Sequence, residues 1–244
     1  MTIDWTRWDS DPYWSGSTYW DSRPPWIRPV RPGTIRWFLK RSVDPVAEPI
    51  TLDFAKKHLR VDFTDDDDLI SALISSAREY IELRTGVAMM PSTWQLVLDR
   101  WPRNSTIEFW PWAGIPWGAI MIPRSPTTAI SSIVWTGTDG SVNTVDPTTY
   151  TTNLVADPAQ VLPAYGKYWP SQSLTPQGGI TVTFTAGYAS AAKVPPTLKQ
   201  ALLLTLGYWY EARESVVIDT RLVALDLPQN AQALIAMWMD TQVG

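Results

Sequence analysis

The sequence predicts an α+β protein with a helical core of about four helices, an inserted small antiparallel β-sandwich or barrel, and an extended N-terminal arm. Apolar residues recur at helical spacing in residues 51–85 and again from residue 195 onward. Between these stretches, residues 89–188 contain short β-type runs separated by Pro, Gly, Asn and Asp. The first 49 residues are dense in proline and tryptophan and keep neither period.

These patterns divide the chain into four parts. We expect a Trp/Pro-rich arm over residues 1–49 and a first helical part over residues 50–88. An inserted β domain follows over residues 89–190, and a second helical part over residues 191–244 ends in a docking helix.

The arm is expected to act through its aromatic side chains. A segment with so many prolines cannot close a hydrophobic core of its own. Trp and Arg anchor protein interfaces, so we expect a neighbouring subunit or a partner to hold the arm, with a floppy leader as the alternative. The candidate anchors are Trp5, Trp8, Trp14, Trp20, Trp26 and Trp37.

The first helical part predicts two helices. Thr51 is suited to cap the earlier one, and Asp53 lies in its first turn. The second begins at Asp65–Asp68, where acidic side chains favour the positive end of a helix. It runs to about Thr85, and Gly86 is placed to end it.

The stretch from Val194 to Ser215 predicts the central helix of the core. Pro195 and Pro196 fit a first helical turn, whose backbone donors lack partners. Residues on nearly every side of this helix are apolar, so we expect it to be buried on several sides. Its apolar residues are Leu198, Ala201, Leu202, Leu203, Leu204, Leu206, Trp209 and Tyr210. A last short helix follows Leu227-Pro228.

The β domain is expected to be antiparallel because its strands are short and closely spaced. Asp139-Gly140 predicts a hairpin turn after one of them. The expected strands are Thr93–Leu98, Ile107–Phe109, Ala119–Ile122, Ile130–Trp135 and Ile180–Thr185.

Composition argues against several classes of protein. The net charge is -4 and the pI about 5.0, so no basic surplus favours wrapping nucleic acid. The chain has 0 cysteines, which removes disulfides and thiolate metal sites and fits a reducing compartment. No apolar segment resembles a signal peptide, and Thr205 and Gly207 interrupt the longest apolar run. We expect a soluble chain with no membrane contact.

The sequence offers little for catalysis or metal binding. His58 is the single histidine and sits in a helix that needs its other face for packing, so we expect no catalytic residue and no enzyme. Counting from Asp62 as the first residue of a calcium loop, Asp67 stands where the loop needs glycine and Leu73 where it needs glutamate. We therefore expect neither a metal nor a cofactor, and interpret the aspartates as a solvated helix start.

Aromatic residues in the β domain leave one alternative open. Trp110, Trp112 and Trp117 could form a platform that binds sugars by ring stacking. Core aromatics or an interface patch explain the same residues more simply, since aromatics dominate both. A flat exposed row would favour the sugar.

Taken together, these segments resemble the head-to-tail connector (adaptor, or head-completion) proteins of long-tailed bacteriophages and gene transfer agents. The resemblance covers roughly residues 50–240 and leaves the arm without a counterpart. In the first helical part it rests on Leu52, Ala55, Lys56, His58, Leu59, Arg60, Val61, Asp62, Asp67, Leu69, Ile70, Leu73, Ile74, Ala77, Arg78, Ile81, Glu82, Thr85 and Gly86. Further on it rests on Trp94, Pro123, Pro126, Ile130, Ile133, Trp169, Pro170, Val182, Phe184, Ala186, Gly187, Tyr188, Val194, Pro195, Ala201, Trp209, Tyr210, Arg213, Glu214, Leu227 and Pro228.

The resemblance implies a structural virion protein. Such a protein forms a homo-oligomeric ring of about twelve subunits beneath the portal, through heterologous interfaces. It extends the DNA channel, lets double-stranded DNA pass without specific binding, and offers a surface to the next neck or tail-completion protein. We expect assembly in the host cytoplasm and a final place in the virion neck.

The resemblance to connectors implies roles for three sets of residues. The portal-docking candidates are Leu234, Ile235, Trp238 and Met239. The channel-lining candidates are Asp65, Asp66, Asp67 and Asp68. The arm tryptophans grip an adjacent subunit or a neck partner, and the roles of arm and docking helix could be exchanged. The competing class is a carbohydrate-binding module on a virion surface.

Overall fold

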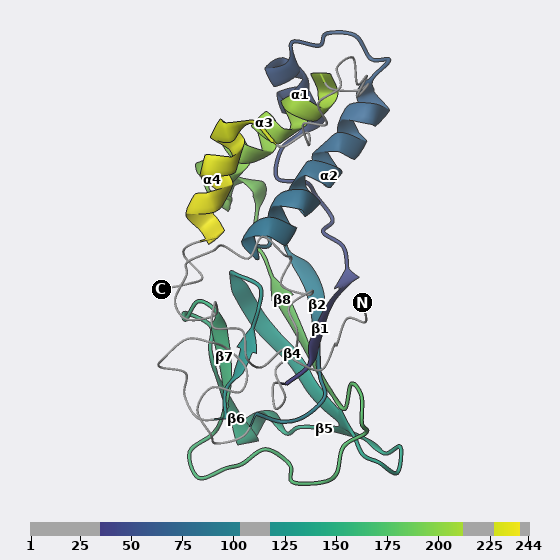
Figure 1. The fold of residues 1–244 in the computed structure, drawn as a ribbon, viewed down its shortest axis with the longest axis vertical. Coiled ribbons are helices and arrows are strands. Elements are labelled where there is room, and N and C mark those ends of the chain that lie inside the picture. The colour runs from purple at the N-terminus through teal and green to yellow at the C-terminus, as the bar shows by residue number, and fades with distance from the viewer. Residues whose placement is uncertain (1–34, 103–117, 212–226, 240–244) are drawn as a thin grey trace, which may run out of the picture. The chain divides into compact units, whose positions relative to one another are not determined.

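The structure is a computed structural model that describes residues 35–102, 118–211 and 227–239 (Figure 1). All of these residues belong to one compact unit, residues 33–244. The unit contains a helical part and a β part, each with its own hydrophobic cluster.

The helices begin and end where the local signals place them. Helix α1 spans Leu52–Leu59, and the Thr51 hydroxyl accepts a hydrogen bond from the Phe54 backbone N–H at 3.2 Å. Helix α2 spans Asp67–Thr85 and ends at Gly86, which adopts the left-handed conformation. Helices α3 and α4 span Pro196–Glu211 and Gln229–Met239. No helix in the described ranges combines the length and apolar character needed to cross a bilayer.

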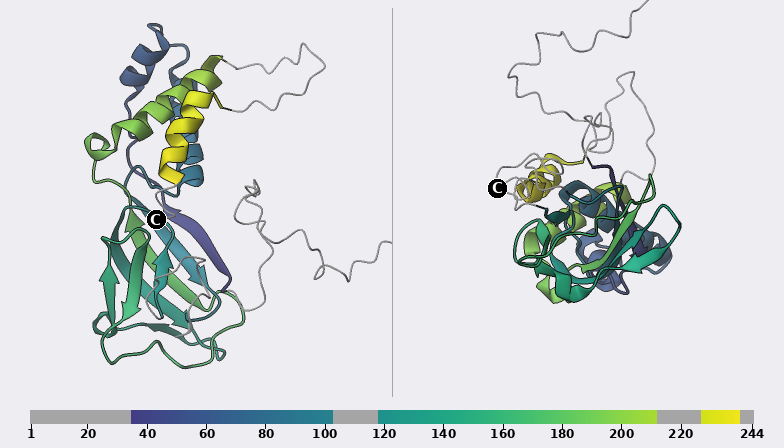
Figure 2. Two further views of the ribbon diagram at one scale, coloured as in Figure 1. Left: turned by 60° about the vertical axis from the view of Figure 1, so that its left-hand side comes forward. Right: turned by 90° about the horizontal axis from the view of Figure 1, so that it is seen from below.

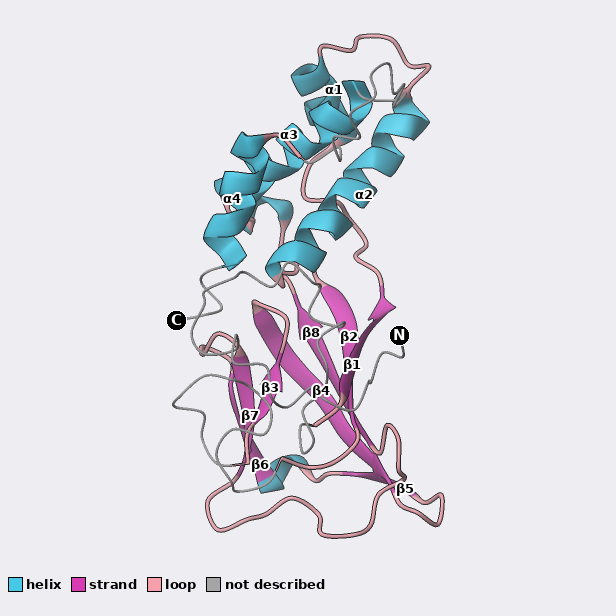
Figure 3. Ribbon diagram, in the orientation of Figure 1, coloured by secondary structure: helices cyan, strands magenta, loops and turns pink. Residues whose placement is uncertain are grey.

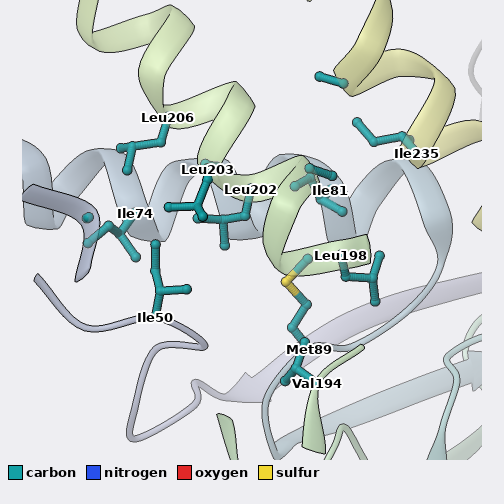
Figure 4. Close-up of a cluster of buried hydrophobic side chains, with 14 of the residues drawn as sticks. Ile50, Ile74, Ile81, Met89, Val194, Leu198, Leu202, Leu203, Leu206 and Ile235 are labelled. Carbon is teal, nitrogen blue, oxygen red and sulfur yellow. The ribbon is translucent and has the colours of Figure 1, made fainter. Parts of the chain in front are cut away.

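Helix α3 is the centre of the helical part, as its sequence predicts. From Ala201 to Tyr210 no residue is exposed, because α3 packs against α1, α2 and α4. Figure 4 shows side chains of α3 in one hydrophobic cluster with Ile81 of α2 and Ile235 of α4. The α3 residues buried in this cluster are Leu198, Ala201, Leu202, Leu203 and Leu206.

The strands form two antiparallel sheets (Figure 3). The larger has the order β1-β2-β8-β4-β5 and the smaller the order β3-β7-β6. The larger sheet comprises Trp37–Val43, Ser92–Leu98, Ile180–Ala186, Thr127–Thr136 and Val142–Thr144, in that spatial order. The smaller comprises Ile120–Ile122, Ala159–Pro163 and Tyr150–Asn153.

Both sheets contribute to one core. In β2 and β8 alternate residues are buried, as expected for strands with one covered face. Leu96 and Val182 from the larger sheet lie in the same cluster as Ile122 and Val161 from the smaller one. The α+β prediction with an inserted antiparallel β domain is thus confirmed.

The strands differ from the sequence expectation in three places. Strand β1 lies inside the range assigned to the arm, because pairing with β2 makes residues 37–43 the edge of the larger sheet. Strands β6 and β7 were not expected, since each is short and bordered by turn residues. The expected strand Ile107–Phe109 lies outside the described residues. The hairpin at Asp139-Gly140 joins β4 to β5.

The two parts meet where β2 and β8 reach the helices (Figure 2). Gly187, directly after β8, has a φ of 124°, and its N–H donates to the Pro126 carbonyl. A Cβ at this position would overlap the Met90 carbonyl, which lies just before β2. Only glycine therefore lets the two strand ends come together beneath the helices.

We predict that Gly187→Ala lowers the free energy of unfolding by about 3 kcal/mol or more, through backbone strain and overlap combined. Gly166→Ala is the matched control, because Gly166 also has a positive φ (72°) but no neighbour within 4 Å of an added Cβ. Its cost should be about 1–2 kcal/mol. Urea unfolding followed by tryptophan fluorescence measures both, and equal losses would contradict the steric argument.

Candidate interaction surfaces

A buried cluster of charges joins the helices to the sheet. Arg78 and Glu82 lie one turn apart on the inner face of α2, with side chains 5% and 2% exposed. Arg78 donates to Glu82 at 3.1 Å and to Glu48 at 2.7 Å. Arg41 of β1 donates to the same Glu82 carboxylate at 3.3 Å, and the backbone N–H of Met89 donates to it at 2.8 Å.

Two arginines also stack on Trp94 of β2. The guanidinium of Arg41 lies 4.9 Å from the Trp94 ring centroid and that of Arg124 lies 4.5 Å from it. Arg124 also donates to the backbone carbonyl of Glu82. Residues from β1, α2, β2 and the segment after β3 therefore converge on one point and fix the helical part on the sheet.

Burial shifts the pKa values of this cluster. Burial raises the pKa of the Glu82 carboxyl, and the surrounding guanidinium groups offset only part of that rise. Burial lowers the pKa of Arg124 to about 10, against the opposing effect of the Glu82 carboxylate. For Arg78, burial alone lowers the pKa, but Glu48 and Glu82 raise it on balance. The cluster holds three cations around one buried carboxylate.

We predict that Glu82→Ala lowers the free energy of unfolding by about 3–5 kcal/mol, because it leaves buried guanidinium groups unpaired. Glu79→Ala is the control, since Glu79 lies on the same helix and also contacts Arg41, but its side chain is 53% exposed. Its loss should be under about 1 kcal/mol. Chemical denaturation measures both, and a similar small loss in each would show that the cluster does not hold the two parts together.

The aspartates at the start of α2 divide into two pairs. The Asp66 carboxylate accepts from the Tyr210 hydroxyl at 2.6 Å, and Asp67 pairs with Lys56 of α1. These two therefore fix α2 to its neighbours. Asp65 and Asp68 are exposed. Of the predicted channel-lining set, Asp65 and Asp68 have side chains facing solvent.

The helix face predicted to dock onto a portal is largely used inside the chain. Ile235 is 4% exposed and lies in the helical cluster, and Leu234 packs partly buried against it. The Trp238 indole donates to the Thr197 hydroxyl at 3.1 Å. Met239 is 44% exposed, and Met237, which the sequence analysis did not select, is 60% exposed. Met239 also borders a cavity of about 470 Å³ between α2 and α4.

A second cavity, of about 700 Å³, lies on the β part. Trp101 and Trp169 stack at its wall with ring centroids 4.9 Å apart and planes 8° from parallel. Trp101 is not among the residues predicted from the sequence. Its partner follows β7 far along the chain, so only the folded sheets bring the pair together.

The remaining candidate residues lie in different surroundings. Trp37 is partly buried against the β core, so it serves the sheet rather than an arm. Trp5, Trp8, Trp14, Trp20, Trp26, Trp110, Trp112 and Trp117 lie outside the described residues. His58 is exposed in the last turn of α1. Within the described ranges, no group of three or more His, Cys, Asp or Glu side chains is placed to hold a metal ion.

The described residues form an α+β fold. Its surface includes exposed apolar side chains and two open cavities. Residues 49–153 match the sequence model of a family described as "Phage gp6-like head-tail connector protein". The matched residues include α1, α2 and the strands from β2 to β6. This match confirms the resemblance to head-to-tail connectors.

Solved structures show the same fold over most of the chain. A chain of the "Neck of empty GTA particle computed with C6 symmetry" has a TM-score of 0.62 and 20% identity, covering 82% of this chain and 94% of its own. A chain of the "Virion of native gene transfer agent (GTA) particle" has a TM-score of 0.62 and 21% identity, with the same coverages. A chain of the "Neck of native GTA particle computed with C12 symmetry" has a TM-score of 0.53 and 21% identity, covering 80% and 93%. No curated protein matches this chain.

Proposed function

We propose that this chain is a structural, non-enzymatic protein of the neck of a phage or gene-transfer-agent particle, a head-to-tail connector. The proposal rests on two findings taken together, the family match and the likeness in fold to neck chains. The connector family matches residues 49–153, and the neck chains share the fold over about 80% of the chain. The fold likeness therefore reaches well beyond the family match.

The connector forms a homo-oligomeric ring of about twelve subunits between the portal and the tail. Support comes from the similar neck structures, which have C6 and C12 symmetry. A ring of identical subunits needs two different patches, each fitting the other on the next copy. One face of the ring meets the portal, the other offers a surface to the next neck or tail-completion protein, and DNA passes through the centre.

We assign the portal contact to the exposed end of α4. Met237 and Met239 are accessible, whereas Ile235 is committed to the chain's own core. Methionine is flexible and polarisable, which suits a surface that adapts to a partner. The adjoining cavity between α2 and α4 adds Tyr80 and Arg84 to this surface.

We predict that Met237→Glu combined with Met239→Glu weakens portal binding by about tenfold or more, equivalent to about 1.4 kcal/mol, because each charge must be buried in an apolar contact. Val142→Glu is the control, since Val142 is 70% exposed on β5 in the other part of the chain. Mass photometry of the chain alone and mixed with its portal measures assembly. A normal portal complex from the double variant would remove this docking assignment.

The channel prediction rests on the two solvent-facing aspartates. An acidic lining repels DNA phosphates and lets the duplex slide, whereas a ring of lysines binds phosphate and releases counterions. Asp65 and Asp68 are suited to this role because, unlike Asp66 and Asp67, they do not hold α2 in place.

We predict that Asp65→Lys combined with Asp68→Lys slows DNA delivery from assembled particles, and that added salt partly restores it. Asp139→Lys, in the exposed β4–β5 turn, should leave delivery unchanged. The measurement is the rate of DNA release from particles carrying each variant. Unchanged release at low salt from the double variant would place these aspartates away from the DNA path.

The carbohydrate-binding alternative has no observation in its favour at the predicted platform, since Trp110, Trp112 and Trp117 lie outside the described residues. We therefore keep the connector as the proposed function.

A further inference from the structure

The groove on the β part has the chemistry of a peptide-binding site. The stacked pair Trp101 and Trp169 lies at its wall beside Pro102 and Pro170. Tyr168 lines the same groove and is 79% exposed. Grooves lined by aromatic rings bind proline-rich segments, which enter already in the polyproline II conformation and lose little entropy on binding.

The walls of this groove are held in place by the sheet. The Trp169 indole donates to the Gly118 carbonyl at 2.6 Å, which fixes its ring. Asp99 accepts from the Gly178 N–H at 2.9 Å, and its own N–H donates to the Arg36 carbonyl at 3.3 Å. A groove formed before binding does not have to be ordered by its ligand.

The chain itself contains a segment with the matching chemistry. Residues 23–32 read Arg-Pro-Pro-Trp-Ile-Arg-Pro-Val-Arg-Pro, with four prolines, three arginines and no acidic residue. The prolines favour an extended polyproline II segment, and arginine stacks well on aromatic faces. As polyproline II, ten such residues span about 31 Å, a length suited to reaching a neighbouring subunit.

We propose that residues 23–32 of one copy bind in the groove around Trp101, Tyr168 and Trp169 of the neighbouring copy. This rests on the proposed ring, in which every subunit supplies one segment and one groove. The two are different patches, as a heterologous interface requires, so the contact repeats around the ring until it closes. Residues 23–32 thus act as a strap between neighbouring subunits. The sequence prediction for the arm named only its tryptophans and gave no binding site for it.

The absence of cysteine in the sequence permits a direct test by disulfide trapping. One full-length variant carries Val30→Cys in the segment, and another carries Gln172→Cys at the groove. After mixing and mild oxidation, we expect a disulfide-linked heterodimer in good yield, and a ladder of higher oligomers when one chain carries both changes. Excess synthetic peptide of residues 21–34 should suppress the product, whereas the same peptide with its prolines replaced by alanine should not.

Two tyrosines provide matched variants. Adding Tyr168→Ala to the Gln172→Cys chain should reduce the heterodimer by about tenfold or more, equal to about 1.4 kcal/mol of binding. Tyr165→Ala should leave it unchanged, because Tyr165 is fully exposed in the same loop but does not line the groove. Both residues are exposed, so neither change should disturb folding.

The other outcomes separate this inference from the proposed function. If mass photometry shows rings but no disulfide-linked heterodimer forms, the proposal that residues 23–32 bind the neighbouring groove is contradicted. The proposed connector function is then unaffected. A disulfide formed only within the doubly substituted chain would mean that each segment fills its own groove, which also overturns the proposal. Binding of an oligosaccharide that depends on Tyr168, with no peptide effect, would assign the groove to a sugar. Absence of any ring, alone or with portal, would instead count against the connector.

Discussion

The fold depends on the contact between Glu82 and the arginines that surround it. The helical part and the β part each have their own hydrophobic cluster, and the charged cluster joins one part to the other. Arg41 of β1 and Arg78 of α2 meet at the Glu82 carboxylate, and Arg124, which follows β3, donates to the backbone carbonyl of the same residue. Such buried ion pairs add little net stability over apolar packing, but they are costly to break, so they specify a single arrangement.

Local signals predicted the helices well. The caps at Thr51 and Gly86 can be recognised from residues close by in the sequence, and so can the apolar residues on all sides of α3. The structure has these helices where those signals predict them. Strand β1 could not be predicted in the same way, because proline-rich sequence precedes it and only its pairing with β2 makes it a strand. Strands β6 and β7 are neighbours along the chain and pair with each other, but β7 also pairs with β3, which is distant in sequence.

The interaction sites were harder to predict because they depend on what the fold brings together. Arg78 and Glu82 stand four residues apart, a spacing that in sequence looks like an exposed helix pair. The Trp101–Trp169 stack joins two loops that no periodicity connects. The apolar face of α4 was recognised from its spacing, but the sequence gives no sign that Ile235 packs inward while Met237 points to solvent. Tertiary packing decides which apolar residues remain available to a partner.

The most direct test of the connector account is electron cryo-microscopy of particles that contain this chain, with the neck reconstructed around its rotation axis. The account predicts a closed ring of this α+β fold between portal and tail, with each β groove facing the adjacent copy. Density for the chain elsewhere on the particle, or a neck built without it, would contradict the account.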